Sequence, residues 1–156
     1  MAFAACDVSG QSEISQPSSL QQENDMADHS VISTDGAPSA LGPYSQGIVL
    51  PVGDRKLVFV SGQIAIDPAT GELIGGDPAD QVRRVLENVR AVLRAAGTDL
   101  DKVVKTTMFL VDMGDFASCN AAYAEYFTDA PPARATVEVS KLPLGSAVEI
   151  DIVAYA

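Results

Sequence analysis

The stretch Pro-Pro-Ala-Arg-Ala-Thr-Val-Glu-Val at residues 131–139 predicts a turn that leads into a β-strand. Successive side chains of a strand point to opposite sides of a sheet. Arg134, Thr136 and Glu138 therefore share one face of this strand, and the alanine and valine residues between them share the other. The predicted strand is half polar, and its polar face carries a cation, a hydroxyl and a carboxylate.

The last segment of the chain, residues 147–155, repeats this alternation. Glu149 and Asp151 lie on one side of the predicted strand, and valine, isoleucine and alanine residues lie on the other. If the two half-polar strands belong to one sheet, we expect Arg134, Thr136 and Glu149 to converge on a face that is not the ordinary core. That face is the predicted position of a functional site.

Residues 77–97, upstream of these strands, have the pattern of an amphipathic helix. Asp77 is a natural N-cap, Pro78 fits the first helical position, and Gly97 fits the position just past the end. The arginines and a glutamate of this segment share one face of the predicted helix, which we expect to be solvated. The apolar residues recur at the spacing of the opposite face, and they are Val82, Val85, Leu86, Val89, Val92, Leu93 and Ala96. Such a helix covers one face of a sheet.

A second helix is predicted after a strand at residues 102–111, where β-favouring residues are frequent. Asp112 or Asp115 would cap this helix, which would run to about Phe127. Asn120 lies off its apolar stripe. The stripe consists of Phe116, Cys119, Tyr123, Tyr126 and Phe127, and we interpret Cys119 as a core residue.

Two further strand segments precede the first helix, an apolar run at residues 48–50 and a strand at residues 56–61. The second segment is apolar on both sides, so we expect helices to cover one face of the sheet and another subunit to cover the other. The sequence Ser61-Gly62-Gln63 interrupts this strand as a bulge or bend would. The element order predicts an α+β fold in which two helices pack on one face of a mixed sheet.

The composition, 47% hydrophobic and 20% charged in 156 residues, is typical of one globular domain. Residues 1–30 are rich in Ser, Gln and acidic residues, and we expect them to be a disordered extension of a domain at residues 31–156. The formal net charge of −11 and the absence of a Lys/Arg cluster argue against a nucleic-acid partner.

The two cysteines, Cys6 and Cys119, lie in the extension and on a helical stripe, so they do not form a disulfide framework. We therefore expect a reducing, cytoplasmic location. No run of about 18 apolar residues is present, so no membrane association is expected.

Histidine chemistry is not expected in the folded domain, because the single histidine, His29, belongs to the predicted extension. There is no Gly-rich phosphate loop and no Cys/His metal spacing, so no metal is expected. Nucleophilic catalysis by a Ser/His or Cys/His pair is excluded, because the predicted folded domain contains no histidine. Any chemistry must come from arginine, carboxylates, hydroxyls, amides and the backbone.

Arg134 and Glu149 have two interpretations. They could form a structural ion pair between neighbouring strands, or Arg134 could grip a substrate carboxylate while Glu149 holds a water molecule. The same choice between a structural and a functional role applies to the remaining candidates, which are Thr136, Tyr44, Ser61 and Asn120.

Several motifs occur along the chain in one order. They are Gly42-Pro43-Tyr44-Ser45-Gln46-Gly47, Val60-Ser61-Gly62-Gln63, the helix end at Asn88 to Gly97, Val104-Lys105-Thr106-Thr107, Asp115-Phe116 with Asn120, Pro132-Ala133-Arg134 and Glu149. Together these motifs resemble the Rid family, the reactive-intermediate imine deaminases, which are also called the YjgF or L-PSP family. The resemblance runs from about Ser33 to Tyr155 and follows the order and spacing of the family. It implies a chorismate-mutase-like fold, a homotrimer with active sites between subunits, and no cofactor.

The activity implied by the resemblance is hydrolysis of 2-aminoacrylate and related 2-imino acids to 2-keto acids and ammonia. Pyridoxal-phosphate enzymes such as serine and threonine dehydratases release these intermediates. Arg134 matches the arginine that holds the substrate carboxylate, and Glu149 matches the glutamate that helps to place the attacking water. Tyr44, Ser61 and Asn120 match residues that line the cleft, with Tyr44 supplied across the interface.

Thr136 stands where many members of the family have cysteine, so regulation through a thiol is not expected. A hydroxyl can still donate a hydrogen bond to water or to a substrate amine. Two other functions remain open. One is a single-strand-specific ribonuclease or translation inhibitor, an activity also attached to the family, and the other is a non-catalytic trimer that binds small ligands or acts like a chaperone.

Overall fold

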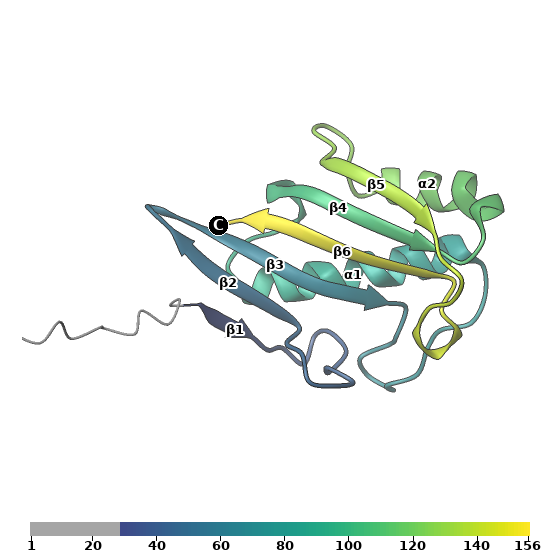
Figure 1. Ribbon diagram of the computed structural model, residues 1–156, viewed down its shortest axis with the longest axis horizontal. Coiled ribbons are helices and arrows are strands. Elements are labelled where there is room, and N and C mark those ends of the chain that lie inside the picture. The colour runs from purple at the N-terminus through teal and green to yellow at the C-terminus, as the bar shows by residue number, and fades with distance from the viewer. Residues whose placement is uncertain (1–28) are drawn as a thin grey trace, which may run out of the picture.

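The computed structural model describes residues 29–156, which form a six-stranded sheet with two α-helices (Figure 1). The strands are β1 (Ser30–Ile32), β2 (Gly47–Val52), β3 (Arg55–Ile64), β4 (Val103–Leu110), β5 (Ala133–Glu138) and β6 (Val148–Tyr155). The helices are α1 (Pro78–Ala95) and α2 (Phe116–Ala124), and the short 3₁₀ turns are η1 (Leu100–Lys102), η2 (Met113–Asp115) and η3 (Pro143–Gly145). The predicted element order is confirmed. Most of the predicted extension lies outside the described residues, so the domain boundary stays a prediction.

The sheet is mixed, as predicted. Its strand order is β1-β2-β3-β6-β4-β5, in which β4 and β5 are parallel and all other neighbours are antiparallel. Helix α1 connects β3 to β4, and α2 connects β4 to β5. Figure 1 shows both helices behind the same face of the sheet. The other face has no helix over it within residues 29–156.

Helix α1 begins and ends as its sequence predicts. The Asp77 carboxylate accepts a hydrogen bond from the Ala79 N–H at 2.8 Å, Pro78 is the first helical residue, and Gly97 has a φ of +82°, a conformation that glycine adopts without strain. The apolar stripe of α1 is buried against the sheet. No helix in residues 29–156 is long and apolar enough to cross a membrane.

The second helix differs from its predicted limits. The 3₁₀ turn η2 comes first, and Asp112 caps it by accepting a hydrogen bond from the Gly114 N–H at 2.7 Å. The α-helix begins only at Phe116 and ends at Ala124, before the predicted Phe127. Its last turn tightens, because the Tyr126 N–H bonds to the carbonyl three residues earlier. Phe127 still packs on the ring of Tyr123, with 4.5 Å between the ring centroids.

The predicted interruption of β3 is a β-bulge. Val60 pairs with Ile152 of β6, whereas Gln63 pairs with Ile150, so β3 has one residue more than β6 between these pairs. Asn88 of α1 fixes the chain beyond the bulge, because its amide donates to the carbonyl oxygens of Ile64 and Ile66 at 3.2 and 2.8 Å. The bulge therefore sits on a buried polar anchor.

The expected convergence of Arg134, Thr136 and Glu149 on one face of the chain's own sheet is wrong. Thr106 of β4 pairs with Arg134, which places Arg134 and Thr136 on the face covered by helices. Phe109 of β4 pairs with Glu149, which places Glu149 on the open face. Paired residues of neighbouring strands share a face, so the register puts the arginine and the glutamate on opposite sides.

The open face of the sheet carries apolar side chains on several strands. Phe59 on β3 and Val137 on β5 are each 41% exposed, although both belong to strands that pair well with their neighbours. The sequence expectation that β3 is apolar on both sides is confirmed.

Candidate active site

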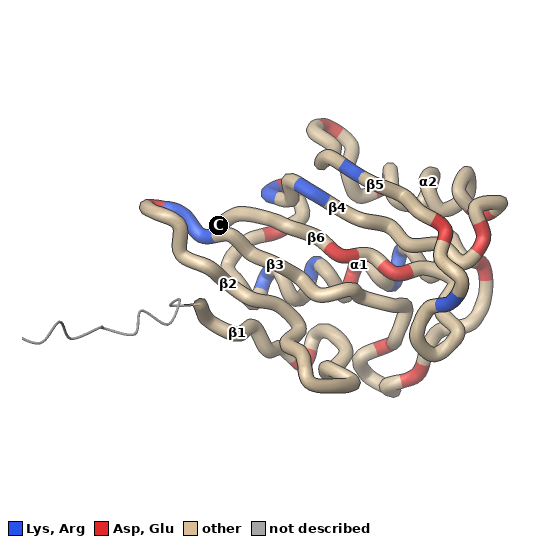
Figure 2. The backbone as a smooth tube through the Cα atoms, viewed as in Figure 1, with Lys and Arg blue, Asp and Glu red and all other residues tan. Residues whose placement is uncertain are grey.

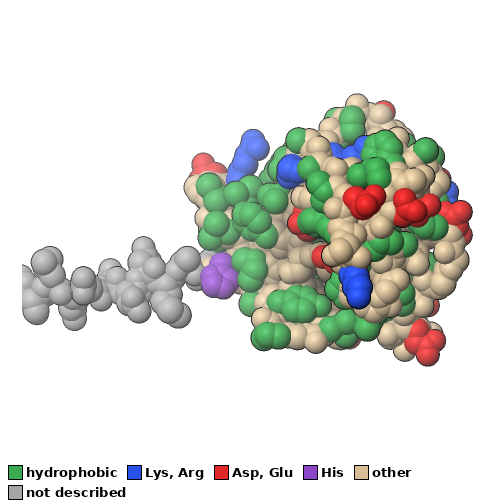
Figure 3. Space-filling view, turned by 45° about the vertical axis from the view of Figure 1, so that its right-hand side comes forward, with side chains coloured by type: hydrophobic (Ala, Val, Ile, Leu, Met, Phe, Trp, Pro, Cys, Tyr) green, Lys and Arg blue, Asp and Glu red, His purple; other side chains and the backbone are tan. Residues whose placement is uncertain are grey.

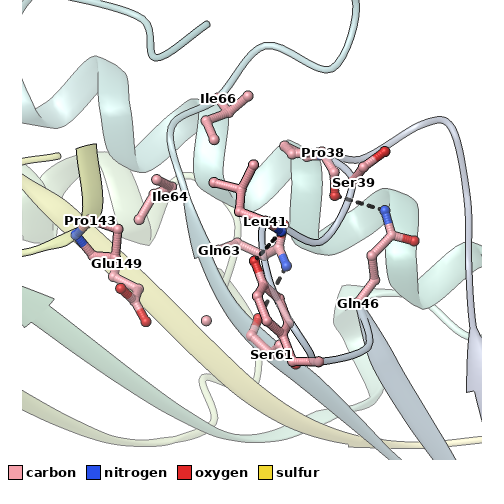
Figure 4. A pocket seen from close by; sticks show the side chains of 12 residues that line it. Pro38, Ser39, Leu41, Gln46, Ser61, Gln63, Ile64, Ile66, Pro143 and Glu149 are labelled. Carbon is pink, nitrogen blue, oxygen red and sulfur yellow. Dashed lines mark hydrogen bonds between the residues drawn. The ribbon is translucent and has the colours of Figure 1, made fainter. Parts of the chain in front are cut away.

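The first half of the candidate site is an open cavity of about 430 Å³ between the loop that precedes β2, the bulge of β3, and β6. It brings together three residues that the sequence selected, Tyr44, Ser61 and Glu149. Figure 4 shows Glu149 and Ser61 on one side of this cavity, and Figure 3 shows the hollow on the surface. The complete lining is Pro38, Ser39, Leu41, Tyr44, Gln46, Ser61, Gly62, Gln63, Ile64, Ile66, Pro143 and Glu149.

The loop that forms one wall is held in place by a buried glutamine and by Tyr44. The amide of Gln46 donates to the carbonyl oxygens of Ala37 and Pro38 at 3.1 and 2.8 Å, and its own carbonyl accepts from the Thr34 N–H at 2.7 Å. The Tyr44 hydroxyl accepts a hydrogen bond from the Leu41 N–H at 3.1 Å. Sequence reasoning missed Gln46 as a positioning residue, although a glutamine at the junction of a turn-rich segment and an apolar strand was a usable signal.

Ser61 lies at the bulge with its hydroxyl already engaged. Its Oγ donates to the carbonyl oxygen of Ser45 at 2.6 Å, and its backbone N–H donates to the Gln46 carbonyl at 3.1 Å. The proton of this hydroxyl is therefore committed to the chain. What Ser61 offers to the cavity is an oxygen that can accept a hydrogen bond.

Glu149 reaches the cavity because residue 62 has no side chain. A Cβ atom at Gly62 would overlap the Glu149 carboxylate and lie 2.8 Å from its Cδ. Burial raises the pKa of Glu149 above its usual range, and the nearby charge of Asp151 raises it further. The structural ion pair between Arg134 and Glu149 that the sequence left open does not form within one chain, because the two residues lie on opposite faces of the sheet.

The second half of the candidate site lies between β5 and α2. The Arg134 guanidinium stacks over the ring of Tyr123 at 4.6 Å and over that of Phe116 at 5.8 Å. Its Nη2 donates to Oδ1 of Asn120 at 2.7 Å, and the Tyr123 hydroxyl is hydrogen-bonded to Thr106 at 2.9 Å. The bond to Asn120 is the only hydrogen bond of the Arg134 guanidinium within residues 29–156, so most of its N–H donors can still bind an anion.

The structure places Asn120 against Arg134, on the same side of α2 as Phe116 and Tyr123. Phe116, Asn120 and Tyr123 follow the i, i+4, i+7 spacing, and all three meet Arg134 on one side of α2. That spacing was the signal for Phe116 and Tyr123, which sequence reasoning assigned to the core alone.

Thr136 lies two residues beyond Arg134 on the same face of β5. Its Oγ1 is buried and has no hydrogen-bond partner within residues 29–156. Cys119 is buried in the core, as predicted, and burial raises the pKa of its thiol. Within the same residues no group of three or more His, Cys, Asp or Glu could hold a metal ion.

Each half has a different chemical capacity. The half that contains Arg134 can bind a carboxylate, and the half that contains Glu149 can hold a water molecule or exchange a proton. The sheet separates the two halves of one chain, so neither half has the whole set of groups.

Comparisons with known proteins agree with this fold. The family described as Endoribonuclease L-PSP matches residues 34–156. The protein DfrA of Myxococcus xanthus is 56% identical over 125 residues, which cover 80% of this chain and 94% of DfrA. The 2-iminobutanoate/2-iminopropanoate deaminase of Homo sapiens is 46% identical over 124 residues, which cover 80% of this chain and 88% of the human protein.

Solved structures give the same result. The crystal structure of TdcF from E. coli with bound serine has a TM-score of 0.74 and 42% identity, and the match covers 81% of this chain and 98% of TdcF. The crystal structure of the yjgF gene product from E. coli has a TM-score of 0.72 and 44% identity, over 80% of this chain and 97% of that protein. By its sequence, its mixed sheet with two helices, and these likenesses, the chain belongs to the Rid family, which is also called the YjgF or L-PSP family.

Proposed function

We propose that this protein hydrolyses 2-imino acids, including the imine formed from 2-aminoacrylate, to 2-keto acids and ammonia. The relatives named as 2-iminobutanoate/2-iminopropanoate deaminases support this reaction class. The observation that carries the proposal is the pair of complementary half-sites, an anion-binding Arg134 on one face of the sheet and a half-buried Glu149 on the other.

The proposed reaction needs few groups. Arg134 binds the substrate carboxylate, and Glu149 orients a water molecule that adds to the imine carbon. The resulting carbinolamine takes up a proton on nitrogen and expels ammonia, which leaves the 2-keto acid. The imine carbon is already electrophilic, so orientation and proton transfer supply most of the catalysis. Tyr44, Ser61, Asn120 and Thr136 line the completed site in this proposal, and no cofactor takes part.

The two half-sites meet between two copies of the chain in this proposal. A contact between different surfaces of two subunits is heterologous, and it forms a closed ring when the rotation allows. We propose a homotrimer of this kind, in which the open sheet face with Phe59 and Val137 is buried between subunits. The exposure of these apolar side chains in the single chain supports that assembly.

Mixed assemblies test the intersubunit site directly. Arg134→Ala and Glu149→Gln should each abolish acceleration of keto-acid release from 2-aminoacrylate that a serine dehydratase generates in the assay. When equal amounts of the two inactive variants are refolded together, about a quarter of the sites should regain both halves, since each half is intact in half of the subunits.

The same experiment has an internal control. Wild type refolded with an equal amount of the double variant should show, per mole of total subunit, about a quarter of the activity of wild type alone if two chains supply the site, and about a half if one chain does. Failure of the mixed single variants to regain activity, with the oligomeric state unchanged, would contradict the intersubunit site. Failure of wild type to accelerate keto-acid release would contradict the deaminase itself and favour a non-catalytic binding protein.

A ribonuclease is the alternative that the family description suggests. The net charge of −11 weighs against it, and Figure 2 shows acidic residues gathered at the end of the sheet where the β5–β6 loop and the turn before α2 lie. RNA affinity that falls steeply with salt would support this alternative, because phosphate contacts release counterions.

A further inference from the structure

We propose that the apolar side of the cavity binds the side chain of the substrate, so that this protein prefers 2-imino acids with aliphatic side chains of about three or four carbon atoms. Leu41 and Ile66 would set that preference. This inference rests on the proposed function and adds the class of substrate.

Part of the cavity lining is apolar, although Ile64 and Pro143 lie beside Glu149, and Ser39 and Gln46 lie beside Pro38. Figure 4 shows Ile66, Leu41 and Pro38 gathered at one side, away from Glu149 and Ser61. No charged side chain lines the apolar side. A surface of this kind favours a hydrocarbon group over water, and each methylene transferred to it lowers the free energy.

The cavity is also larger than a small imino acid needs. The imine of alanine has six heavy atoms, which fill roughly 180 Å³ when each occupies about as much space as a water molecule. The cavity measures about 430 Å³. The deaminases among the relatives are named for 2-iminopropanoate and 2-iminobutanoate, which carry methyl and ethyl groups. Space for a longer side chain therefore remains.

The apolar side is built into the single chain and is held rigidly. Ile66 is only 2% exposed, and the Asn88 amide donates to its carbonyl oxygen at 2.8 Å. Ile66 also forms a β-bridge with Leu73. The floor of the apolar side thus does not depend on a partner subunit.

Leu41 forms the rim opposite this floor. It is 63% exposed, yet its backbone is fixed, because its N–H donates to the Tyr44 hydroxyl and Gln46 holds the root of the same loop. A leucine whose position is fixed at the mouth of an apolar cavity can contact a ligand with little loss of conformational entropy.

The test compares the imines of leucine and alanine, each generated in the assay by an amino-acid oxidase, with the full chain. Wild type should show a kcat/KM at least about tenfold higher for the leucine imine. Leu41→Asp places a charge at the rim and should lower the ratio of the two values by about tenfold or more. Leu144→Asp is the matched control, because Leu144 is also 63% exposed but does not line the cavity, and it should leave the ratio unchanged.

Equal kcat/KM values for the two imines, or an equal ratio in wild type and Leu41→Asp, would overturn the inference. If wild type accelerates neither imine, the proposed function fails, and binding then tests the cavity alone. Calorimetry should show that the leucine-derived keto acid, 4-methyl-2-oxopentanoate, binds at least about tenfold more tightly than pyruvate. Equal affinity for the two keto acids would overturn the inference without reference to catalysis.

Discussion

Arg134 shows how a charged residue can be prepared for a ligand without being neutralised. Aromatic rings of Phe116 and Tyr123 support its plane, and Asn120 occupies only one of its donors. Stacking and a fixed hydrogen bond orient the guanidinium before an anion arrives, so less entropy is lost on binding. A carboxylate partner within the chain would have satisfied the charge and removed this capacity.

Arg134→Lys is expected to lower kcat/KM for 2-imino acids by about 10- to 100-fold. Lysine keeps the charge but loses the planar fork and the stacking on Tyr123. Steady-state kinetics measure the effect. The control is Arg94→Lys, whose exposed side chain pairs with Asp99 on the surface and whose activity should equal that of wild type. Equal activity of both variants would rule out a bidentate role for Arg134.

Glu149 makes a second prediction, which concerns pH. Its raised pKa means that the residue is protonated in part of the range where an ordinary glutamate is ionised. If the carboxylate form is active, kcat/KM rises with pH through this raised pKa. Asp151→Asn removes a negative neighbour and should shift the acidic limb of the profile to lower pH. An unchanged limb would mean that another group titrates there.

The same pKa has a consequence for stability. A carboxyl with a raised folded-state pKa binds more protons in the folded than in the unfolded chain, so its ionisation costs folding free energy as pH rises from its ordinary pKa of 4.5 through the raised pKa. Ionised Glu149 therefore lowers the stability of the folded chain above this pH range.

At the scale of the elements, the bulge of β3 joins fold and function. Gly62 lies in the bulge, where the missing side chain leaves space for the Glu149 carboxylate. The bulge lies next to the anchor that Asn88 provides, so its geometry is held from the helix side. A local irregularity of one strand therefore opens the polar side of the cavity.

Gly62→Ala is expected to reduce activity at least about tenfold while changing the free energy of unfolding by less than about 1 kcal/mol. The new methyl would meet the end of the Glu149 side chain, which can swing away but then leaves its position. Gly75→Ala is the control, since nothing lies within 4 Å of a Cβ at that position. Chemical denaturation and kinetics on the same preparations separate the two effects, and a large loss of stability with full activity would contradict this account.

At the scale of the whole molecule, one face of the sheet has no helix over it within residues 29–156. Figure 1 shows α1 and α2 on the other side, and the open face carries Phe59 and Val137. The face that packs against helices supplies the core, and the open face supplies the surface for the proposed assembly. The position of the half-sites on opposite faces fits a ring better than a single chain.

Phe59→Asp is expected to convert the proposed trimer to monomers and to abolish activity, because a buried charge without a partner destabilises an apolar interface. Light scattering coupled to size exclusion measures the mass, and circular dichroism checks that the sheet and helices remain. Leu144→Asp, at an exposed position of η3, should keep the mass of wild type. A folded, trimeric Phe59→Asp variant would place the interface elsewhere.

Local patterns determined much of this structure in advance. The caps at Asp77 and Gly97 and the interruption at Gly62 follow from single-residue preferences, so they could be predicted. The predicted end of α2, at about Phe127, lies beyond the observed end at Ala124. Phe127 is apolar and fits the helical spacing, but it packs on Tyr123 from outside the helix. Gln46 was missed, since its three carbonyl partners come from a loop whose path no local pattern reveals.

The sequence by itself determined which residues share a side of each strand: Arg134 with Thr136, and Glu149 with Asp151. Only the tertiary structure decided which of these sides faces the helices. Alternation with period two fixes side chains relative to their own strand, whereas the pairing register with the neighbouring strand fixes the face of the sheet, and a shift of one residue would exchange the faces. Long-range packing sets that register, and it separated Arg134 from Glu149.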